Sequence, residues 1–438
     1  MRLLAGAFIT LIVGLSLLSA CAGGAVSGEV VATHIATSTQ PAPTPAGLPS
    51  PDTPVAVTVS PPMRQKLTLW LPPQFDPSAP TAGAKLFRDR LQAFEQQNPQ
   101  VEVTVRLKAL SGPAGLLEML TAAHAAAPAA LPSLVALTRF DLETAAIKGI
   151  VYPFETSFDA GEEEEDDWLE YARQLGQVQG SAMGLPFAGD ALVLLYRPSR
   201  AGSPPKDWLD LLQRDQPILF PVADPYSLLT LDLYLSAGGV LQDNQSKPML
   251  QAEILEKVLR FYVDGADQNS FPEWMVQLEN EEQTWQSYRE QNAHWLVTHS
   301  SYYLANPPAD TLAAPLPSLS SGNFTLAGGW LWAVADPDPQ RRQLAELLAQ
   351  YLTDETFLRQ WSPYSGYLPV RASSLSGWDK QTLRMLAGEV TRSAQVQPPG
   401  ELVNILGPIL QEATIAAIRD HSNPTQIAQT AAAKLVTP

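Results

Sequence analysis

The sequence has almost no cysteine: Cys21 is the only one among 438 residues. A disulfide within the chain is therefore excluded, and the folded part must be stable without cross-links. Positive charge is also scarce, because 28 Lys and Arg residues stand against 45 Asp and Glu residues, which gives a formal net charge of -17. This balance disfavours sequence-independent binding to nucleic acid and electrostatic attraction to anionic lipid.

The motifs of common enzymes are absent as well. The sequence contains no G-x-S-x-G nucleophile elbow, no H-E-x-x-H zinc pair and no Walker-type phosphate loop. Of the five histidines, His294 and His299 lie five residues apart on a predicted strand, so they point to opposite faces and make a poor metal pair. We expect no enzyme activity, no cofactor and no metal. A carboxylate pair for glycoside hydrolysis stays open, because its signature is spatial.

The N-terminus has the layout of a secretory signal. Arg2 precedes an apolar run from Leu3 to Leu18, and the small residues Ser19 and Ala20 follow. The stretch Leu18 to Cys21 resembles the lipobox of bacterial lipoproteins, which implies removal of residues 1–20 and a lipid on Cys21. The alternative is a membrane-spanning helix, but Gly and Ser follow where a stop-transfer signal has basic residues. We therefore expect an extracytoplasmic protein anchored to the membrane through Cys21.

Residues 21–65 are predicted to form a disordered stalk. The segment "ATSTQPAPTPAGLPSPDTPVAVTVSPP" is rich in small residues and proline, and has too little apolar surface to offset the entropy of ordering it. A short strand at Val55–Val59 is the alternative. Further along, the acidic run Glu162–Asp167 is interpreted as a solvated loop or helix start rather than a cation site, because it lacks the glycines and spacing of a metal loop.

The chain from Lys66 onward is long enough for two lobes. Its first part alternates period-two stretches typical of strands with stretches of helical spacing. Strand, helix, strand, helix, strand predicts parallel pairing through crossovers and hence an α/β fold. The strands are expected at 66–71, 101–107 and 133–138, and the helices at 84–99, 114–126 and 140–148.

The order of several segments resembles the extracellular solute-binding proteins of the maltose-type, sugar-binding family 1, the receptors of ATP-driven importers. The segments are "QAFEQQNPQVEVTV", "KGIVYPFE", "MGLPFAGDALVLLYRP", "DWLDLLQR", "LAGGWLWAV" and "SGYLPVRASSL". The resemblance covers residues 66–438. It implies a two-lobed periplasmic-binding-protein fold of type II, a monomer that encloses a small solute, most often a carbohydrate, and passes it to permease subunits.

The resemblance also implies discontinuous lobes joined at a hinge. The N-terminal lobe is expected to comprise residues 66–189 and 310–361, and the C-terminal lobe residues 190–309 and 362–438. The chain is expected to cross between them near Gly189–Leu194 and again near Ser300–Pro308. A ligand in the cleft favours closure only through contacts that the open state lacks.

Sugar rings have apolar faces and hydroxyl edges, so the expected ligand contacts are aromatic rings beside polar side chains. For each residue a structural role is the alternative: a core position for Trp330, a helix cap for Asp224, a hinge carboxylate for Asp190 and an ion pair for Arg371. Phe140 and Asp141 are interpreted as ordinary helix-start residues. The residues that the resemblance assigns to substrate binding are Asp190, Asp224, Tyr226, Tyr302, Trp330, Tyr367 and Arg371.

The ligand itself stays open. The first loop, "PPQFDPSAPTAG", is longer and richer in proline than is typical of the family, and Ser133 stands where many relatives have aspartate. An aromatic-rich cleft also suits quaternary ammonium compounds, peptides or polyols. Two other functions are kept as alternatives: a sensor or scaffold of the same fold that has lost transport, and an extracytoplasmic glycoside hydrolase.

Overall fold

The computed structural model describes residues 64–155, 167–214, 216–290, 293–319 and 322–435. The predictions for Cys21, for the signal and stalk segments before residue 64 and for most of the acidic run lie outside these residues. The elements up to the middle of the chain are β1 (Gln65–Leu71), η1 (Pro73–Phe75), α1 (Ala82–Gln97), β2 (Val101–Leu107), α2 (Leu116–Ala126), η2 (Pro128–Ala130), β3 (Leu134–Thr138), α3 (Arg139–Ile147), α5 (Glu170–Gly176), β4 (Gln177–Val178), β5 (Ser181–Ala182), β6 (Leu185–Tyr196), α6 (Pro198–Ala201) and α7 (Trp208–Leu212).

The second half of the chain continues the mixture of helices and strands. It contains β7 (Ile218–Leu219), α8 (Leu228–Ser236), α9 (Ala252–Asp267), η3 (Glu273–Gln277), α10 (Glu281–Arg289), β8 (Trp295–His299), α11 (Ser300–Ala305), β9 (Leu312–Pro315), β10 (Thr325–Val334), α12 (Pro339–Leu352), α13 (Glu355–Ser365), η4 (Ala372–Gly377), α14 (Gln381–Ser393), β11 (Ala394–Val396), α15 (Gly400–Asp420) and α16 (Pro424–Ala433).

The predicted α/β alternation at the start of the chain is confirmed. All six expected elements are present as β1, α1, β2, α2, β3 and α3, with ends that differ from the prediction by a few residues. Local chemistry explains the boundaries of α1: the Thr81 hydroxyl accepts a hydrogen bond from the Ala84 N–H at 3.1 Å, which caps the first turn. Phe87, Leu91 and Phe94 then repeat at helical spacing and form the buried face.

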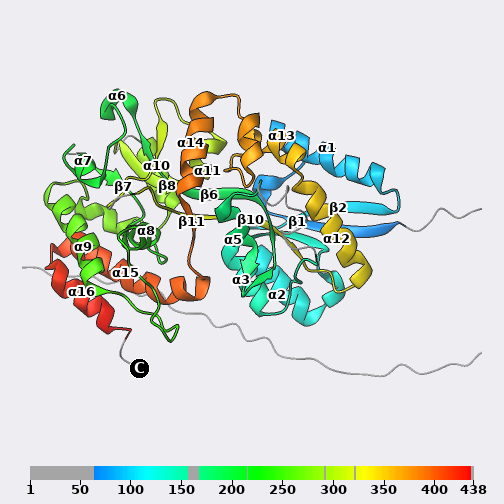
Figure 1. The fold of residues 1–438 in the computed structure, drawn as a ribbon, viewed down its shortest axis with the longest axis horizontal. Coiled ribbons are helices and arrows are strands. Elements are labelled where there is room, and N and C mark those ends of the chain that lie inside the picture. Colours follow the sequence, from blue (N-terminus) through cyan, green and yellow to red (C-terminus); the bar gives the residue numbers. More distant parts are fainter. Residues whose placement is uncertain (1–63, 156–166, 215, 291–292, 320–321, 436–438) are drawn as a thin grey trace, which may run out of the picture. The chain divides into compact units, whose positions relative to one another are not determined.

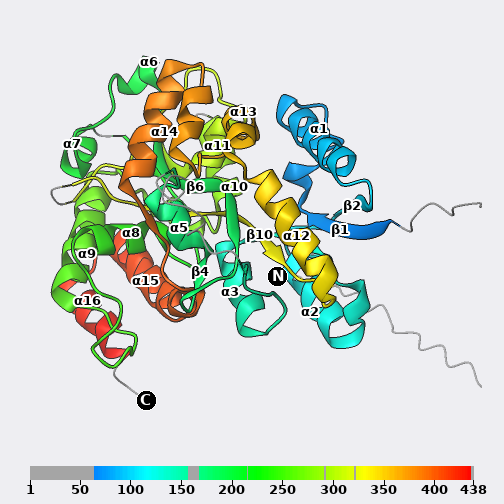
Figure 2. The ribbon, with the colours of Figure 1, turned by 45° about the vertical axis from the view of Figure 1, so that its right-hand side comes forward.

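Two long strands, β6 and β10, lie at the centre of the sheet and join its two ends. Its order is β2-β1-β3-β10-β6-β8-β7, with β11 on β10 and β9 on β6. In β10, residues 325–327 pair with β11, residues 330–334 pair with β3, and residues 327–332 pair on the other edge with residues 185–191 of β6. Figure 1 shows β1, β2, α1, α2 and α12 on one side of these strands, and β7, β8, α9, α15 and α16 on the other. The turned view of Figure 2 shows the same separation.

The partners of β6 change at the point where the sequence predicts the first crossing. Up to Ala191 the strand pairs with β10, and from Leu192 onward it pairs with β8 and β9. A second change of partners lies in β10, where residues 325–327 pair with β11 and residues 330–334 pair with β3. The predicted second crossing at Ser300–Pro308 includes α11, and the strand that follows it, β9, pairs with residues 193–196 of β6.

The side of the sheet that carries β7 and β8 is covered by a long apolar helix. Among the described residues, α15 is the one helix whose length and composition would suffice to cross a membrane. Half of its apolar window is buried, and it packs against α8, α9 and α16. This is the position of a core helix, which explains its apolar composition without a membrane.

Three chain segments meet at Gly189. On one side its backbone exchanges two hydrogen bonds with Leu368, at 2.9 and 2.8 Å, and on the other side it pairs with Gly329 of β10. A Cβ atom at position 189 would overlap the Tyr171 hydroxyl, which itself donates to the Pro369 carbonyl. A Cβ at position 329 would lie 2.5 Å from the Ala188 carbonyl oxygen. The absence of both side chains lets the strands approach here.

We predict that Gly189→Ala destabilises the protein by about 1–3 kcal/mol, because the added methyl group displaces the Tyr171 ring from a packed core. Gly388→Ala is the matched control: the nearest atom to its Cβ is 3.8 Å away, on Leu375, and the position lies inside α14. The control is expected to be neutral or slightly stabilising. Urea unfolding of both variants measures the difference, and equal midpoints would contradict the packing argument.

Candidate functional site

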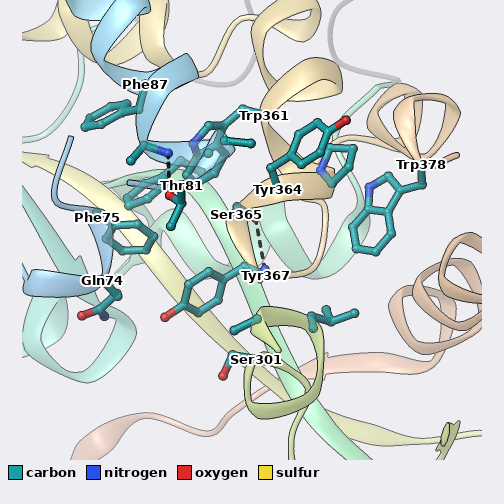
Figure 3. Close-up of a pocket in the computed structure, with 18 of the residues that line it drawn as sticks. Gln74, Phe75, Thr81, Phe87, Ser301, Trp361, Tyr364, Ser365, Tyr367 and Trp378 are labelled. Carbon is teal, nitrogen blue, oxygen red and sulfur yellow. Dashed lines mark hydrogen bonds between the residues drawn. The ribbon is translucent and has the colours of Figure 1, made fainter. Parts of the chain in front are cut away.

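A cavity of about 800 Å³ lies beside the first loop of the chain. Its walls come from η1 and the residues after it, the start of α1, α11, the end of α13 and the segment that leads from η4 into α14. Figure 3 shows Gln74 and Phe75 on one side of Tyr367, and Tyr364 and Trp378 on the other. A cavity of this size, with mostly apolar walls and a few polar groups, is typical of a small-molecule site.

Phe75 is the centre of the aromatic wall. Its ring lies 5.0 Å from Phe187, 5.4 Å from Trp330 and 5.3 Å from Tyr367, measured between ring centroids. The contact with Trp330 is edge-to-face, at an interplanar angle of 84°. The side chains of Gln74 and Trp330 lie close enough to the Tyr367 hydroxyl to lower its pKa, against the burial that raises it. The rings therefore hold one another in fixed orientations.

The polar end of the site is organised around Asp190. Its Oδ1 accepts hydrogen bonds from the Ser300 hydroxyl at 2.7 Å and from the Ser301 N–H at 3.0 Å. Burial raises the pKa of Asp190, although the charge of His299 acts in the opposite direction. Burial and the negative charge of Asp190 raise the pKa of the Tyr302 and Tyr367 hydroxyls. Both hydroxyls stay protonated and remain hydrogen-bond donors.

A charged pair lies next to this end. The Nδ1 atom of His299 is 2.8 Å from Oε2 of Glu281, whose other oxygen accepts the His299 N–H at 2.7 Å and the Thr298 hydroxyl at 2.9 Å. Burial alone would lower the pKa of His299, but the attraction of Glu281, and of Asp190 and Asp224 as well, raises it to about 9. The histidine is thus a fixed positive charge among three carboxylates.

Four of the predicted residues come together. Tyr302 and Tyr367 line the cavity, Asp190 lies close enough to shift the pKa of both hydroxyls, and Trp330 packs against Phe75. Trp330 is only 8% exposed, so its ring supports the wall from behind.

The other three predicted residues lie elsewhere. Asp224 accepts the N–H groups of Tyr226 and Leu228, at 3.0 and 3.1 Å, which is the contact that the cap interpretation predicts. Tyr226 is 42% exposed, and its ring lies 5.8 Å from Phe140 on α3. Neither residue lines the cavity.

Arg371 does not line the cavity and has the contacts that the ion-pair alternative predicts. Its side chain is buried, its Nε donates to the Thr353 carbonyl at 2.9 Å, and its Nη1 lies 3.4 Å from Asp167. The guanidinium also stacks over Trp168, 4.0 Å from the ring centroid. With its hydrogen-bonding capacity directed into the protein, Arg371 joins segments that are far apart in the sequence, as the ion-pair alternative predicts.

Sequence reasoning missed several wall residues. Gln74 and Phe75 belong to the proline-rich first loop, whose unusual length was the signal that it borders the site. Trp361 and Tyr364 lie on α13, and Trp378 follows η4; their spacing is that of any amphipathic helix and gives no sign of a cavity.

The His299–Glu281 pair predicts a specific pH dependence. A histidine whose pKa rises from 6.5 to about 9 on folding contributes stability that is complete below pH 6.5 and is lost as the pH rises to 9. Glu281→Gln should remove this dependence and lower the pKa of His299, at a cost of about 1–3 kcal/mol at pH 6. Glu282→Gln is the control, since Glu282 is exposed and adjacent. Histidine-ring NMR titration and urea unfolding measure both effects; a His299 midpoint near 6.5 in the unaltered protein would refute the prediction.

Comparisons with known proteins give a consistent result. Residues 89–384 match the family model described as bacterial extracellular solute-binding protein. A comparison with curated protein sequences gives no match. Among solved structures, the cyclic alpha-maltosyl-1,6-maltose binding protein from Arthrobacter globiformis has a TM-score of 0.69 at 16% identity, over 85% of this chain and 98% of that one.

Two further structures have the same fold. The sugar-binding protein MalE from Xanthomonas citri has a TM-score of 0.69 at 19% identity, with 85% of this chain and 96% of that chain covered. A solute-binding protein of an ABC transporter from Thermotoga lettingae, bound to alpha-D-tagatose, has a TM-score of 0.64 at 18% identity, with 85% and 98% covered. The fold is thus the mixed α/β, two-lobed fold of periplasmic sugar-binding proteins. The chain belongs to the bacterial extracellular solute-binding protein family.

Proposed function

We propose that this protein is a lipid-anchored receptor that binds a carbohydrate, encloses it between two lobes and delivers it unchanged to the permease subunits of an ABC importer. The observation that carries the proposal is the cavity beside Asp190. Aromatic rings, hydroxyl groups and a carboxylate come together there, at the point where β6 changes its pairing partners. Aromatic faces suit the C–H faces of sugar rings, and the polar groups suit their hydroxyls. The family and the sugar-binding proteins among the similar structures support the same proposal.

The lobes in this proposal divide where the long strands change partners. One contains β1, β2, β3 and the helices packed on them, and the other contains β7, β8, β9 and helices α8, α9, α15 and α16. Contacts between α3 and the opposite side support an enclosed state: the Glu143 carboxylate accepts the Gly400 N–H at 2.6 Å, at the start of α15, and Phe140 meets Tyr226. A ligand that touches both sides would add to these contacts and favour closure.

A ligand screen tests the binding step. We expect at least one mono- or oligosaccharide to raise the melting temperature of the protein, because a ligand at a hundredfold excess over Kd stabilises the folded state by about 2.7 kcal/mol. Tyr302→Ala should weaken this binding about tenfold through the loss of a wall ring. Tyr152→Ala is the control, because Tyr152 stacks with Arg342 and does not line the cavity. Absence of any shift, or recovery of a hydrolysed sugar, would overturn the proposal.

The anchor is tested separately. We expect the full chain, expressed in a bacterial host, to sediment with membranes and to incorporate a labelled fatty acid at Cys21. Cys21→Ser should abolish both the label and the sedimentation, because two or more acyl chains are needed for durable attachment. Ser27→Ala, six residues further along the stalk, should leave both unchanged. Persistent sedimentation of the Cys21 variant without label would indicate a spanning helix.

A further inference from the structure

The two halves of the cavity differ in polarity. Around Gln74, Tyr302 and Tyr367, side-chain amide and hydroxyl groups face the space beside Asp190. Away from Gln74, the walls are Leu304, Pro363, Tyr364, Trp378 and Leu383, contributed by α11, α13, the residue after η4 and α14, and the hydroxyl-bearing Tyr364 is 55% exposed. Figure 3 shows Trp378 on the side of Tyr367 away from Gln74. We call these five residues the apolar half of the cavity.

The polar side chains next to the apolar half are already engaged. The Ser365 hydroxyl donates to the Ser362 carbonyl at 2.9 Å and accepts the Tyr367 N–H at 3.1 Å. The Thr81 hydroxyl accepts the Ala84 N–H as the cap of α1. The Ser365 hydroxyl therefore has no hydrogen left to donate, whereas the Thr81 hydroxyl can still donate one.

The charged groups of this region lie at its rim. Asp379 and Lys380 are exposed to solvent, where their charges stay hydrated. Asp76, in the first loop, accepts hydrogen bonds from the Ser78 N–H and hydroxyl at 2.8 and 2.7 Å. The interior of the apolar half therefore offers few partners for a buried hydroxyl.

This distribution sets the chemistry of the occupant. A buried hydroxyl without a partner costs about 1–3 kcal/mol, and a sugar ring carries several of them. An apolar group in the same place gains about 25 cal/mol for each Å² removed from water. The apolar half thus favours a planar or aliphatic group over a second sugar ring.

We propose that the preferred ligand is a glycoside with an apolar aglycone: the sugar lies at the polar end and the aglycone, such as an aromatic ring, lies in the apolar half. The inference rests on the proposed function and deepens it, because it names the part of the ligand that a simple sugar lacks. The aglycone contacts Trp378, Leu304 and Leu383, and the sugar hydroxyls meet Gln74, Tyr302 and Tyr367.

The test uses matched pairs of probes on the full chain. Methyl and phenyl glycosides of glucose, maltose and cellobiose, each pair with the same anomeric configuration, are titrated by calorimetry. We expect at least one phenyl glycoside to bind about tenfold more tightly than its methyl partner, because the ring removes apolar wall area from water. Methyl and phenyl glycosides that bind equally would overturn this inference and leave carbohydrate binding intact. Binding of neither kind would overturn both.

A pair of variants on α14 locates the effect. Leu383→Gln places an amide in the apolar half and should bring the phenyl-to-methyl affinity ratio close to one. Met385→Gln is the control, two residues further along the same helix, where the side chain is 55% exposed and does not line the cavity. A ratio that Leu383→Gln leaves unaltered would place the ring elsewhere and refute the assignment.

Discussion

The close pairing of β6 and β10 at Gly189 and Gly329 is the constraint on which the site depends. Both strands run through the middle of the sheet, and neither position has room for a side chain. Because Gly189 also pairs with Leu368, the segment that carries Tyr367 is fixed against the same strand. Asp190 follows directly, so backbone hydrogen bonds determine the separation between its carboxylate and the Tyr367 ring. The polar end of the cavity therefore takes its geometry from the sheet.

The charged groups around Asp190 impose a second constraint on the structure. Asp190, Asp224 and Glu281 converge on a region that the strands bury, in a chain that is already strongly acidic. Three unpaired carboxylates there would repel one another and lose hydration. His299 offsets this by remaining protonated, held by two hydrogen bonds to Glu281 from its ring and its backbone. Its charge lowers the pKa of Asp190 and of Asp224, against the burial that raises both.

Much of the fold, and part of the site, is predictable from the sequence. The early strands and helices follow from side-chain periodicity, which is a local property, and the family order of motifs leads to Asp190, Tyr302, Trp330 and Tyr367. Arg371 shows the limit, because an arginine pairs equally well with a ligand or with a distant carboxylate, and Asp167 lies far from it in sequence. Phe75 and Trp361 show another: their 6.2 Å approach arises from packing between remote segments, which no periodicity records. Site residues whose positions are fixed by the backbone of a strand are thus predictable from the sequence. Residues that tertiary packing brings together are less so.

The position of β10 in the sheet has a consequence for the order in which the molecule assembles. β3 and β6 are neighbours only through β10, which is made long after both. As the chain is synthesised, its early strands therefore stay without a partner at one edge until Thr325–Val334 has been made. The cavity is completed later still, because its walls extend from Gln74 to Leu383. A chain that ends before α14 therefore has the early walls of the cavity without the late ones, however complete its first strands are.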